Sequence, residues 1–261
     1  MKIAVQQFVS NDKDKNTFVS VFKHYSNLTE KKISKEGDLY ALLSISGSKN
    51  LSAERVSKFV WDGLVDGYLY SNAKTTNESL KDSIKEGITT LAIDEYAGEL
   101  CKEYGVKPAF KEVEDYYFNT CISVNDVAVH GLPSDYILKK GDLISIDFGI
   151  VYKGYITDHC WTWCIGKPDA KKKRLLESGR RAVENAMEKA VVGNHIGDLG
   201  FEMEDEARSN GFNILKVFVG HGIGKGLHEY PDIPAFGKRG TGELLADGMV
   251  ICVECQVVDD T

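Results

Sequence analysis

The chain has 261 residues, of which 43% are hydrophobic, and its formal net charge is −7. This size allows a full hydrophobic core, while the acidic balance argues against a nucleic-acid-binding surface, which needs a basic face. No run approaches the roughly 18 consecutive apolar residues of a membrane span, and no signal-peptide pattern is visible. The six cysteines are scattered, as expected for reduced thiols. We therefore predict a cytoplasmic globular protein, a monomer with no membrane partner and no specific nucleic-acid partner.

The first part of the chain differs from the rest because it is rich in Lys, Asp, Asn and Ser. We predict that residues 1–51 form an N-terminal extension, either a small ordered appendage or a mobile segment, and that residues 52–261 form the main domain. A helical pattern begins at Ser52, with apolar residues three to four positions apart as far as Leu69. A second helix is expected over about 90–104.

The remainder alternates between strand and helix patterns. β-rich runs bounded by Gly or Pro predict strands over 121–124, 143–146, 155–158, 214–219 and 249–258. Helices are expected over about 169–192 and from about 198 to just before Asn210. Helices followed by strands, twice over, predict an α+β fold built by duplication, with the helices on one side of the sheet.

Two copies of one pattern stand 107 positions apart (141 to 248). In each, a glycine turn leads into an apolar strand that ends in a carboxylate six residues after the glycine, Asp147 in the first copy and Glu254 in the second. A His-Gly pair, beginning at His130 or His221, precedes each copy. A buried acid costs free energy unless its desolvation is offset, and a metal ion is the usual compensator. The pattern predicts two half-domains that each bring an acid and a histidine to a metal site between them.

Asp158 and His228 extend this candidate set. Asp158 lies eleven residues after Asp147, and a hairpin between their strands would bring both carboxylates to one face. Two close carboxylates repel, and a divalent cation relieves the repulsion. His228 follows His221 by seven residues, across the glycine-rich segment 220–226, which allows tight turns and leaves room for a ligand. Neutral imidazole with several carboxylates suits Mn, Fe, Co or Zn better than Ca or Mg.

Several runs resemble type I methionine aminopeptidase, in order and over roughly residues 52–261. The runs are 121–133, 141–147, 154–158, 220–224, 228–231 and 248–254. The 33 positions from His221 to Glu254 leave no room for the large insertion of type II enzymes. The resemblance implies the pita-bread fold, in which two pseudo-symmetric αβ halves surround an antiparallel sheet.

The resemblance also implies an activity, the metal-dependent removal of the N-terminal methionine from nascent proteins or peptides by a metal-bound hydroxide. Two divalent metal ions (Co, Mn, Fe or Zn) are the implied cofactors. The implied metal ligands are Asp147, Asp158, His221 and Glu254. Glu254 would also shuttle the proton, His228 would stabilise the attacked amide, and His130 would contact the scissile nitrogen.

Substrate binding is implied for a further set of positions that match the family. They are Tyr116, Cys121, His130, Leu227 and His228. The expected partner is the N-terminal methionine of nascent polypeptides, and the N-terminal extension could bind the ribosome.

The chain departs from the family pattern in four places. The family's fifth ligand, a second glutamate, lies well after Glu254 and past the last residue given, Thr261. Without it, we expect one metal position to be weaker and sheet edges to be unpaired. Leu227 stands where a bulky aromatic residue is common, and Cys255 replaces a proline. Segment 110–117 lacks the glycines that the family usually has there, so we expect the substrate pocket to differ in the residues that it selects.

Other functions remain open. A non-catalytic pita-bread binding protein with a decayed metal site is the main alternative, although the visible ligands are intact. An X-Pro-type aminopeptidase is a lesser one, against which the 121–133 run argues. A thiol zinc module is disfavoured because strand alternation puts Cys252 and Cys255 on opposite faces. A phosphate loop at 220–226 fails because no Ser or Thr follows the lysine.

Overall fold

The structure is a computed structural model that describes residues 2–8, 86–152 and 154–259. These residues form a nine-stranded sheet with the order β2-β4-β5-β1-β9-β7-β8, in which β3 also pairs with β4 and β6 with β9. The strands are β1 (Lys2–Phe8), β2 (Lys107–Pro108), β3 (Cys121–Val124), β4 (Leu143–Tyr152), β5 (Tyr155–Cys164), β6 (Asn213–Ile214), β7 (Gly220–Gly222), β8 (Glu229–Ile233) and β9 (Val250–Val258). The helices are α4 (Thr90–Tyr104), α5 (Ala170–Lys189), α6 (Ile196–Ser209) and the short 3-10 helix η3 (Phe110–Glu112).

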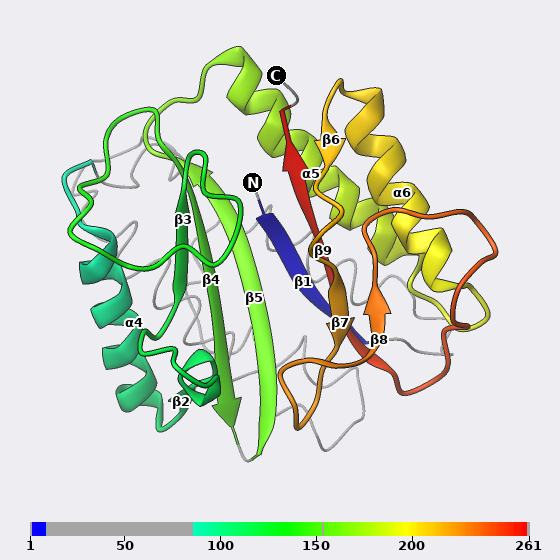
Figure 1. The fold of residues 1–261 in the computed structure, drawn as a ribbon, viewed down its shortest axis with the longest axis horizontal. Helices are drawn as coiled ribbons and strands as arrows, with labels where there is room; N and C mark the ends of the chain where they lie inside the picture. The colour runs from blue at the N-terminus through cyan, green and yellow to red at the C-terminus, as the bar shows by residue number, and fades with distance from the viewer. Residues whose placement is uncertain (1, 9–85, 153, 260–261) are drawn as a thin grey trace, which may run out of the picture.

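The helices cover one face of this antiparallel sheet. In one half, Ile144 and Ile146 of β4 are buried in a cluster with Ile93 of α4. In the other half, Ile251 and Val253 of β9 are buried in a second cluster with residues of α5 and α6. Figure 1 shows α4 beside β3 and β4, and α5 with α6 beside β9 at the other end of the sheet. The predicted α+β class, with helices on one side, is confirmed.

Local signals account for the helix boundaries. Thr89 caps α4 by accepting a hydrogen bond from the Ala92 amide (3.2 Å), and Gly105 ends it in the left-handed conformation, with φ of 66°. Asp169 caps α5 by accepting from the Lys172 amide (2.8 Å). The helix predicted over 90–104 is confirmed, and that over 169–192 is somewhat shorter. The helix predicted from Ser52 lies outside the described residues.

The strand predicted over 214–219 is wrong. β6 ends at Ile214, and the next strand, β7, begins in the glycine-rich segment that we expected to turn. A Cβ on Gly220 would lie 2.2 Å from the carbonyl oxygen of Cys252, and one on Gly222 would lie 2.3 Å from that of Tyr230. These glycines therefore allow β7 to pack closely between β8 and β9.

The predicted duplication is visible in the backbone hydrogen bonds. Leu138 donates to and accepts from residues 87–88 just before α4, with distances of 2.8 and 2.9 Å. Leu245, 107 positions later (138 to 245), makes the same two bonds with residues 193–194 just before α6, at 2.8 and 3.1 Å. Both leucines are fully buried. Each half therefore ties the start of a helix to the turn that precedes its acid-bearing strand.

The N-terminal strand β1 occupies the centre of the sheet. It lies between β5 and β9 and is antiparallel to both (Figure 1). Ala4 pairs with Cys160 on one side and with Glu254 on the other. The expectation of unpaired edges is therefore wrong for β5 and β9, because the first strand of the chain fills the position between them. Residues 9–85 lie outside the described part, so the domain boundary at 51/52 stays a prediction.

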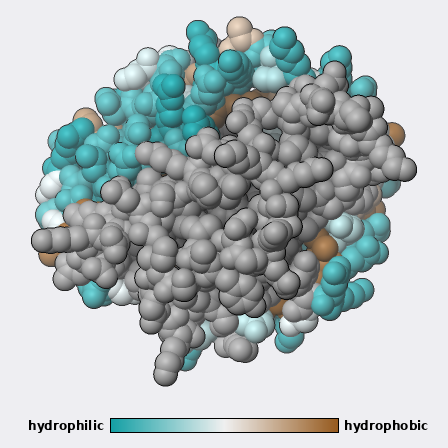
Figure 2. All heavy atoms as spheres, turned by 180° about the vertical axis from the view of Figure 1, so that it is seen from behind, coloured by the Kyte–Doolittle hydropathy of each residue, from teal (hydrophilic) through white to brown (hydrophobic). Residues whose placement is uncertain are grey.

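Among the described residues, no helix is long and apolar enough to cross a membrane. On the side shown in Figure 2, the described residues around the rim are mostly hydrophilic, and apolar residues are scattered among them. The most exposed large apolar side chains are Val217, Tyr117 and Tyr230, at 76–78%.

Helix α6 begins in a turn that depends on Asp198. One carboxylate oxygen of Asp198 accepts a hydrogen bond from the His195 amide (2.7 Å), and the other accepts from the Gly240 amide (2.8 Å). The bond from His195, supported by the bond from Gly240, holds the pKa of Asp198 below its ordinary value.

The substitution Asp198→Ala is expected to lower the free energy of unfolding by about 1 kcal/mol near neutral pH, because two backbone amides lose their acceptor. Since the folded pKa of Asp198 lies below the unfolded one, this contribution is complete above the unfolded pKa and is lost as the pH falls through the folded pKa. Urea denaturation at neutral and acid pH measures it. The control Asp198→Asn keeps a side-chain oxygen and should lose less. If Asp198→Ala lowered the free energy of unfolding equally at neutral pH and below the folded pKa of Asp198, this explanation would be contradicted.

Candidate metal centre

Two adjacent rows of paired residues cross the middle of the sheet and contain the predicted metal-ligand positions. In pairing order, the first row is Cys121, Asp147, Cys160, Ala4 and Glu254. The second row contains Gly149 paired with Asp158 in one half, and Gln6, Cys252 and His221 in the other. Residues paired across antiparallel strands lie on the same face of a sheet. All four predicted metal ligands therefore lie on the face opposite the helices.

The predicted hairpin that brings Asp147 and Asp158 together is confirmed. β4 and β5 pair along their whole length, from Leu143 opposite Cys164 to Tyr152 opposite Tyr155. Asp147 is opposite the residue two positions after Asp158, so the two carboxylates are diagonal neighbours on one face. Their exposed fractions are 5% and 4%.

Glu254 reaches the same face from β9 and is also buried, at 4% exposure. The turn before β9 contains Gly248 with φ of 85°, and the turn before β4 contains Gly141 with φ of 93°. Such positive φ values suit glycine, and the two halves thus use the same turn to begin their acid-bearing strands. The Gln256 side-chain amide donates to Glu254 Oε2 (3.1 Å) and orients this carboxylate.

His221 stands between the carboxylates of the two halves. Its Nε2 atom is 3.7 Å from Asp158 Oδ2 and 3.8 Å from Glu254 Oε1. Its Nδ1 atom lies 2.8 Å from the carbonyl oxygen of Gly222, which can only accept, so Nδ1 carries a proton. This hydrogen bond leaves Nε2 directed at the acids, which is how metal-binding histidines are usually oriented.

The acids also control the charge of this imidazole. Burial by itself lowers the pKa of His221. The Asp158 carboxylate, the Gly222 carbonyl and the charge of Glu254 outweigh burial, so the pKa lies above the ordinary histidine value. An ion that binds Nε2 displaces this proton, which couples metal uptake to pH.

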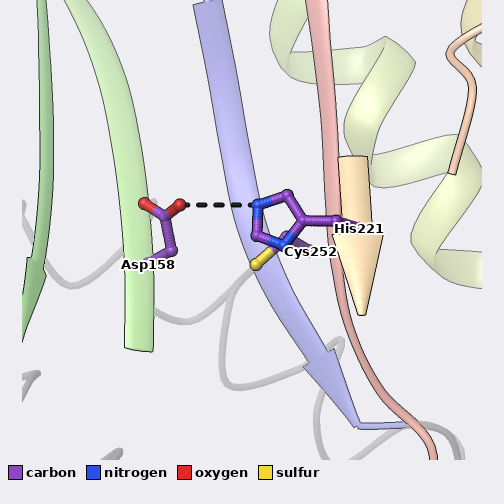
Figure 3. Close-up of side chains that lie close together, drawn as sticks. All are labelled: Asp158, His221 and Cys252. Atoms are coloured by element: carbon purple, nitrogen blue, oxygen red, sulfur yellow. Dashed lines mark ion pairs between the residues drawn. The ribbon is translucent and has the colours of Figure 1, made fainter. Parts of the chain in front are cut away.

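One group of side chains is close enough to surround a single ion. A carboxylate oxygen of Asp158, a ring nitrogen of His221 and the sulfur of Cys252 all lie within 4.8 Å of one another (Figure 3). Asp147 and Glu254 are outside this group, although both lie in the adjacent row. Cys252 was not among the predicted site residues. Its position two residues before Glu254 on the same strand was the signal that could have found it, because alternate strand residues share a face.

The donor set of the site fits a divalent transition-metal ion. Three carboxylates and one imidazole are buried together on this face. Burial of several acidic groups side by side is costly, and a divalent cation is a common means of balancing their charge. Carboxylate oxygen with imidazole nitrogen is a donor set that such ions accept.

An apolar cluster lies on the same face, next to the acids. Its members are Ala109, Phe110, Cys121, Ile156, Ile223 and Cys252, with Tyr116, Val151, Leu227 and Val250 packed against them. Three predicted substrate-binding residues, Tyr116, Cys121 and Leu227, are thus brought together. The Tyr116 hydroxyl donates to the carbonyl oxygen of Thr120 (2.7 Å), and burial raises the pKa of Tyr116, which therefore stays protonated.

The two remaining predicted residues, His130 and His228, are exposed, and of the two His228 contacts the metal-ligand position His221. The ring of His228 packs edge-on against that of His221, with centroids 4.4 Å apart. His130 adopts a positive φ of 55° in the loop after β3, and its ring contacts that of Phe218 at 5.3 Å. Phe218 was not singled out in the sequence, where nothing distinguishes it from a core residue.

The substitution Gly222→Ala is expected to displace β7, because its Cβ would meet the backbone oxygen of Tyr230 at 2.3 Å. His221 precedes this residue, so metal affinity should fall by about tenfold or more. Calorimetric metal titration measures the loss. The matched control is Gly224→Ala, whose nearest neighbour is the flexible side chain of Glu229 at 3.0 Å, and which should bind metal almost normally. Equal affinities for the two variants would contradict the expectation.

Comparison with known proteins agrees with this geometry. The sequence profile of Metallopeptidase family M24 matches residues 72–261. The methionine aminopeptidase of Clostridium perfringens is 37% identical over 178 residues, which cover 68% of this chain and 72% of the relative.

Solved structures show the same likeness. The crystal structure of methionine aminopeptidase from Thermotoga maritima is 38% identical with a TM-score of 0.65, covering 67% of this chain and 71% of that one. The prolidase of Pyrococcus horikoshii has a TM-score of 0.60 at 24% identity, covering 76% of this chain and 55% of that one. At that identity, the prolidase supports the fold alone.

Proposed function

This chain belongs to Metallopeptidase family M24, and from this premise we propose that it removes the N-terminal methionine from polypeptides in a metal-dependent reaction. The observation that carries the proposal is the pair of rows across the sheet, which gathers the acids of both halves and His221 on one face. The relatives at 37% and 38% identity are methionine aminopeptidases, which supports methionine as the residue removed.

The proposed metal ligands are Asp147, Asp158, His221 and Glu254. Burial of the three acids and the short distances from His221 Nε2 to Asp158 and Glu254 support this set. We propose two divalent ions, because acids from both halves line the site. When bound, such ions act as Lewis acids that polarise the scissile carbonyl and make water a better nucleophile at neutral pH.

The protein groups have separate tasks in this proposal. Glu254, oriented by the Gln256 amide, accepts a proton at its carboxylate and returns it to the leaving amine. His228, in contact with His221 at the border of the site, donates a hydrogen bond to the oxygen of the attacked amide. His130, exposed in the loop after β3, would contact the scissile nitrogen.

The apolar cluster would hold the methionine side chain. Tyr116, Cys121 and Leu227 pack in one group beside the acids, and a flexible thioether suits an apolar surface of this kind. A peptide whose first side chain lies here has its free amino group near the acids. That position supports cleavage after a single residue.

Two alternatives make different predictions. A non-catalytic pita-bread protein would keep the fold and release no methionine. An X-Pro aminopeptidase would cleave before proline, but its support here is a likeness in fold at 24% identity. We also propose that the protein is cytoplasmic and monomeric, and that its N-terminal extension binds the ribosome.

The decisive experiment measures methionine release from the peptide Met-Ala-Ser by the full chain, before and after addition of Co²⁺ or Mn²⁺. Metal content is determined on the same sample. Metal-dependent release supports the proposal, and cleavage of a Met-Pro peptide in its place would support the X-Pro alternative. Metal binding without any release would favour the binding protein.

A further inference from the structure

We infer that Cys252 is a sulfur ligand of the metal centre, which narrows the ion that the centre prefers. This inference rests on the proposed function, since it concerns the same site. The Cys252 sulfur, an Asp158 oxygen and a His221 nitrogen lie within 4.8 Å of one another. Around one zinc ion, bonds of about 2.0–2.3 Å place such atoms roughly 3.3–3.6 Å apart. Small side-chain rotations therefore bring all three to a common ion.

The sheet holds the thiol in this position. Cys252 pairs directly with His221 on β7, and it shares its face of β9 with Glu254. Its exposed fraction is 1%, so the sulfur is shielded from solvent and adjoins the imidazole and the acid (Figure 3). A ligand on a central strand is positioned more rigidly than one on a loop.

The position of Cys252 distinguishes it from the other cysteines near the site. Cys255, three residues later, faces the helices, where its sulfur lies 3.9 Å from the Gly179 carbonyl oxygen. Cys121 and Cys160 are in the adjacent row, on either side of Asp147. Of the six cysteines, all of them described, Cys252 is the one grouped with two other possible ligands.

A sulfur ligand changes the preference of the site. Cys252 would bind as the thiolate, releasing its proton to solvent as the ion enters. The metal ion beside Asp158 would then have one sulfur, one nitrogen and carboxylate oxygen as its protein ligands. Thiolate favours Zn²⁺, whereas Mn²⁺ and Mg²⁺ favour oxygen donors. Of the candidate ions Co, Mn, Fe and Zn, we expect zinc to bind most tightly at this position.

Cobalt spectroscopy tests the inference without reference to catalysis. The full chain, titrated with Co²⁺, should develop the intense near-ultraviolet charge-transfer band of a thiolate–cobalt bond. Cys252→Ser should lose the band, and the matched control Cys255→Ser, on the same strand but the other face, should keep it. Zn²⁺ affinity should fall by about tenfold or more in Cys252→Ser, while Mn²⁺ affinity changes much less.

Each outcome separates this inference from the proposed function. Stoichiometric Co²⁺ binding without the band, or a band that survives in Cys252→Ser, would overturn the sulfur ligand and leave the aminopeptidase intact. No Co²⁺ binding by the wild-type chain would overturn both. Should Cys252→Ser fail to fold, ¹¹³Cd resonance of the wild-type chain decides, because a thiolate ligand shifts the cadmium signal far downfield and oxygen and nitrogen ligands alone do not.

Discussion

Asp158→Asn is expected to abolish methionine release and metal binding while the fold is kept. Asp158 is buried on β5, and its carboxylate lies 3.7 Å from His221 Nε2. The amide has nearly the same shape but no charge, and it is a poor ligand for a divalent ion. Activity should fall by at least about 10³-fold. Metal analysis, the Met-Ala-Ser assay and circular dichroism measure the three effects.

Two further expected results make this prediction specific. The metal-free variant should unfold no earlier than the wild type, since one of three buried charges is gone. The pKa of His221 should fall, because the Asp158 carboxylate is a main cause that raises it. The control Asp135→Asn changes an exposed aspartate and should leave all of these properties unchanged. Full peptidase activity in Asp158→Asn would refute the assignment of this site.

Val5→Pro is expected to destabilise the protein by about 3 kcal/mol or more, because proline removes a backbone donor from the centre of the sheet. All seven residues of β1 pair with β9, and Ala4 also pairs with Cys160 of β5. In such a central strand, backbone amides donate to the neighbouring strands, and proline cannot. Disruption of β1 opens the sheet between the strands that carry Asp158 and Glu254, so metal affinity should fall as well.

The matched control is Val5→Thr, which keeps a β-branched residue suited to strands. Denaturant unfolding compares the two variants, and hydrogen exchange follows the amides of β5 and β9, which should lose protection in the proline variant alone. A synthetic peptide of residues 1–9, added to a chain that begins at residue 10, should restore this protection by strand addition. Equal stability of the two Val5 variants would show that β1 does not pair in the sheet.

Much of the fold was predictable because its signals are local. The helix over 90–104 begins at a threonine cap and ends at a glycine, and both signals lie within the helix sequence or next to it. The duplication was visible because Gly141 and Gly248 start the same turn in each half. Asp147 and Glu254 could be proposed as ligands because the same glycine-to-acid pattern occurs twice, although the predicted strand ends were wrong: β4 continues past Asp147 to Tyr152, and β9 continues past Glu254 to Val258.

By itself, the sequence determined the α+β class, and it predicted two related halves with acids and a histidine on their shared face, because these features depend on short local patterns and on their repetition along the chain. Only the tertiary structure decided that Cys252 joins Asp158 and His221, and that β1 lies beside Glu254. These arrangements depend on which strands become neighbours. β1 pairs with a strand about 250 residues away, and no periodicity within either strand specifies that partner.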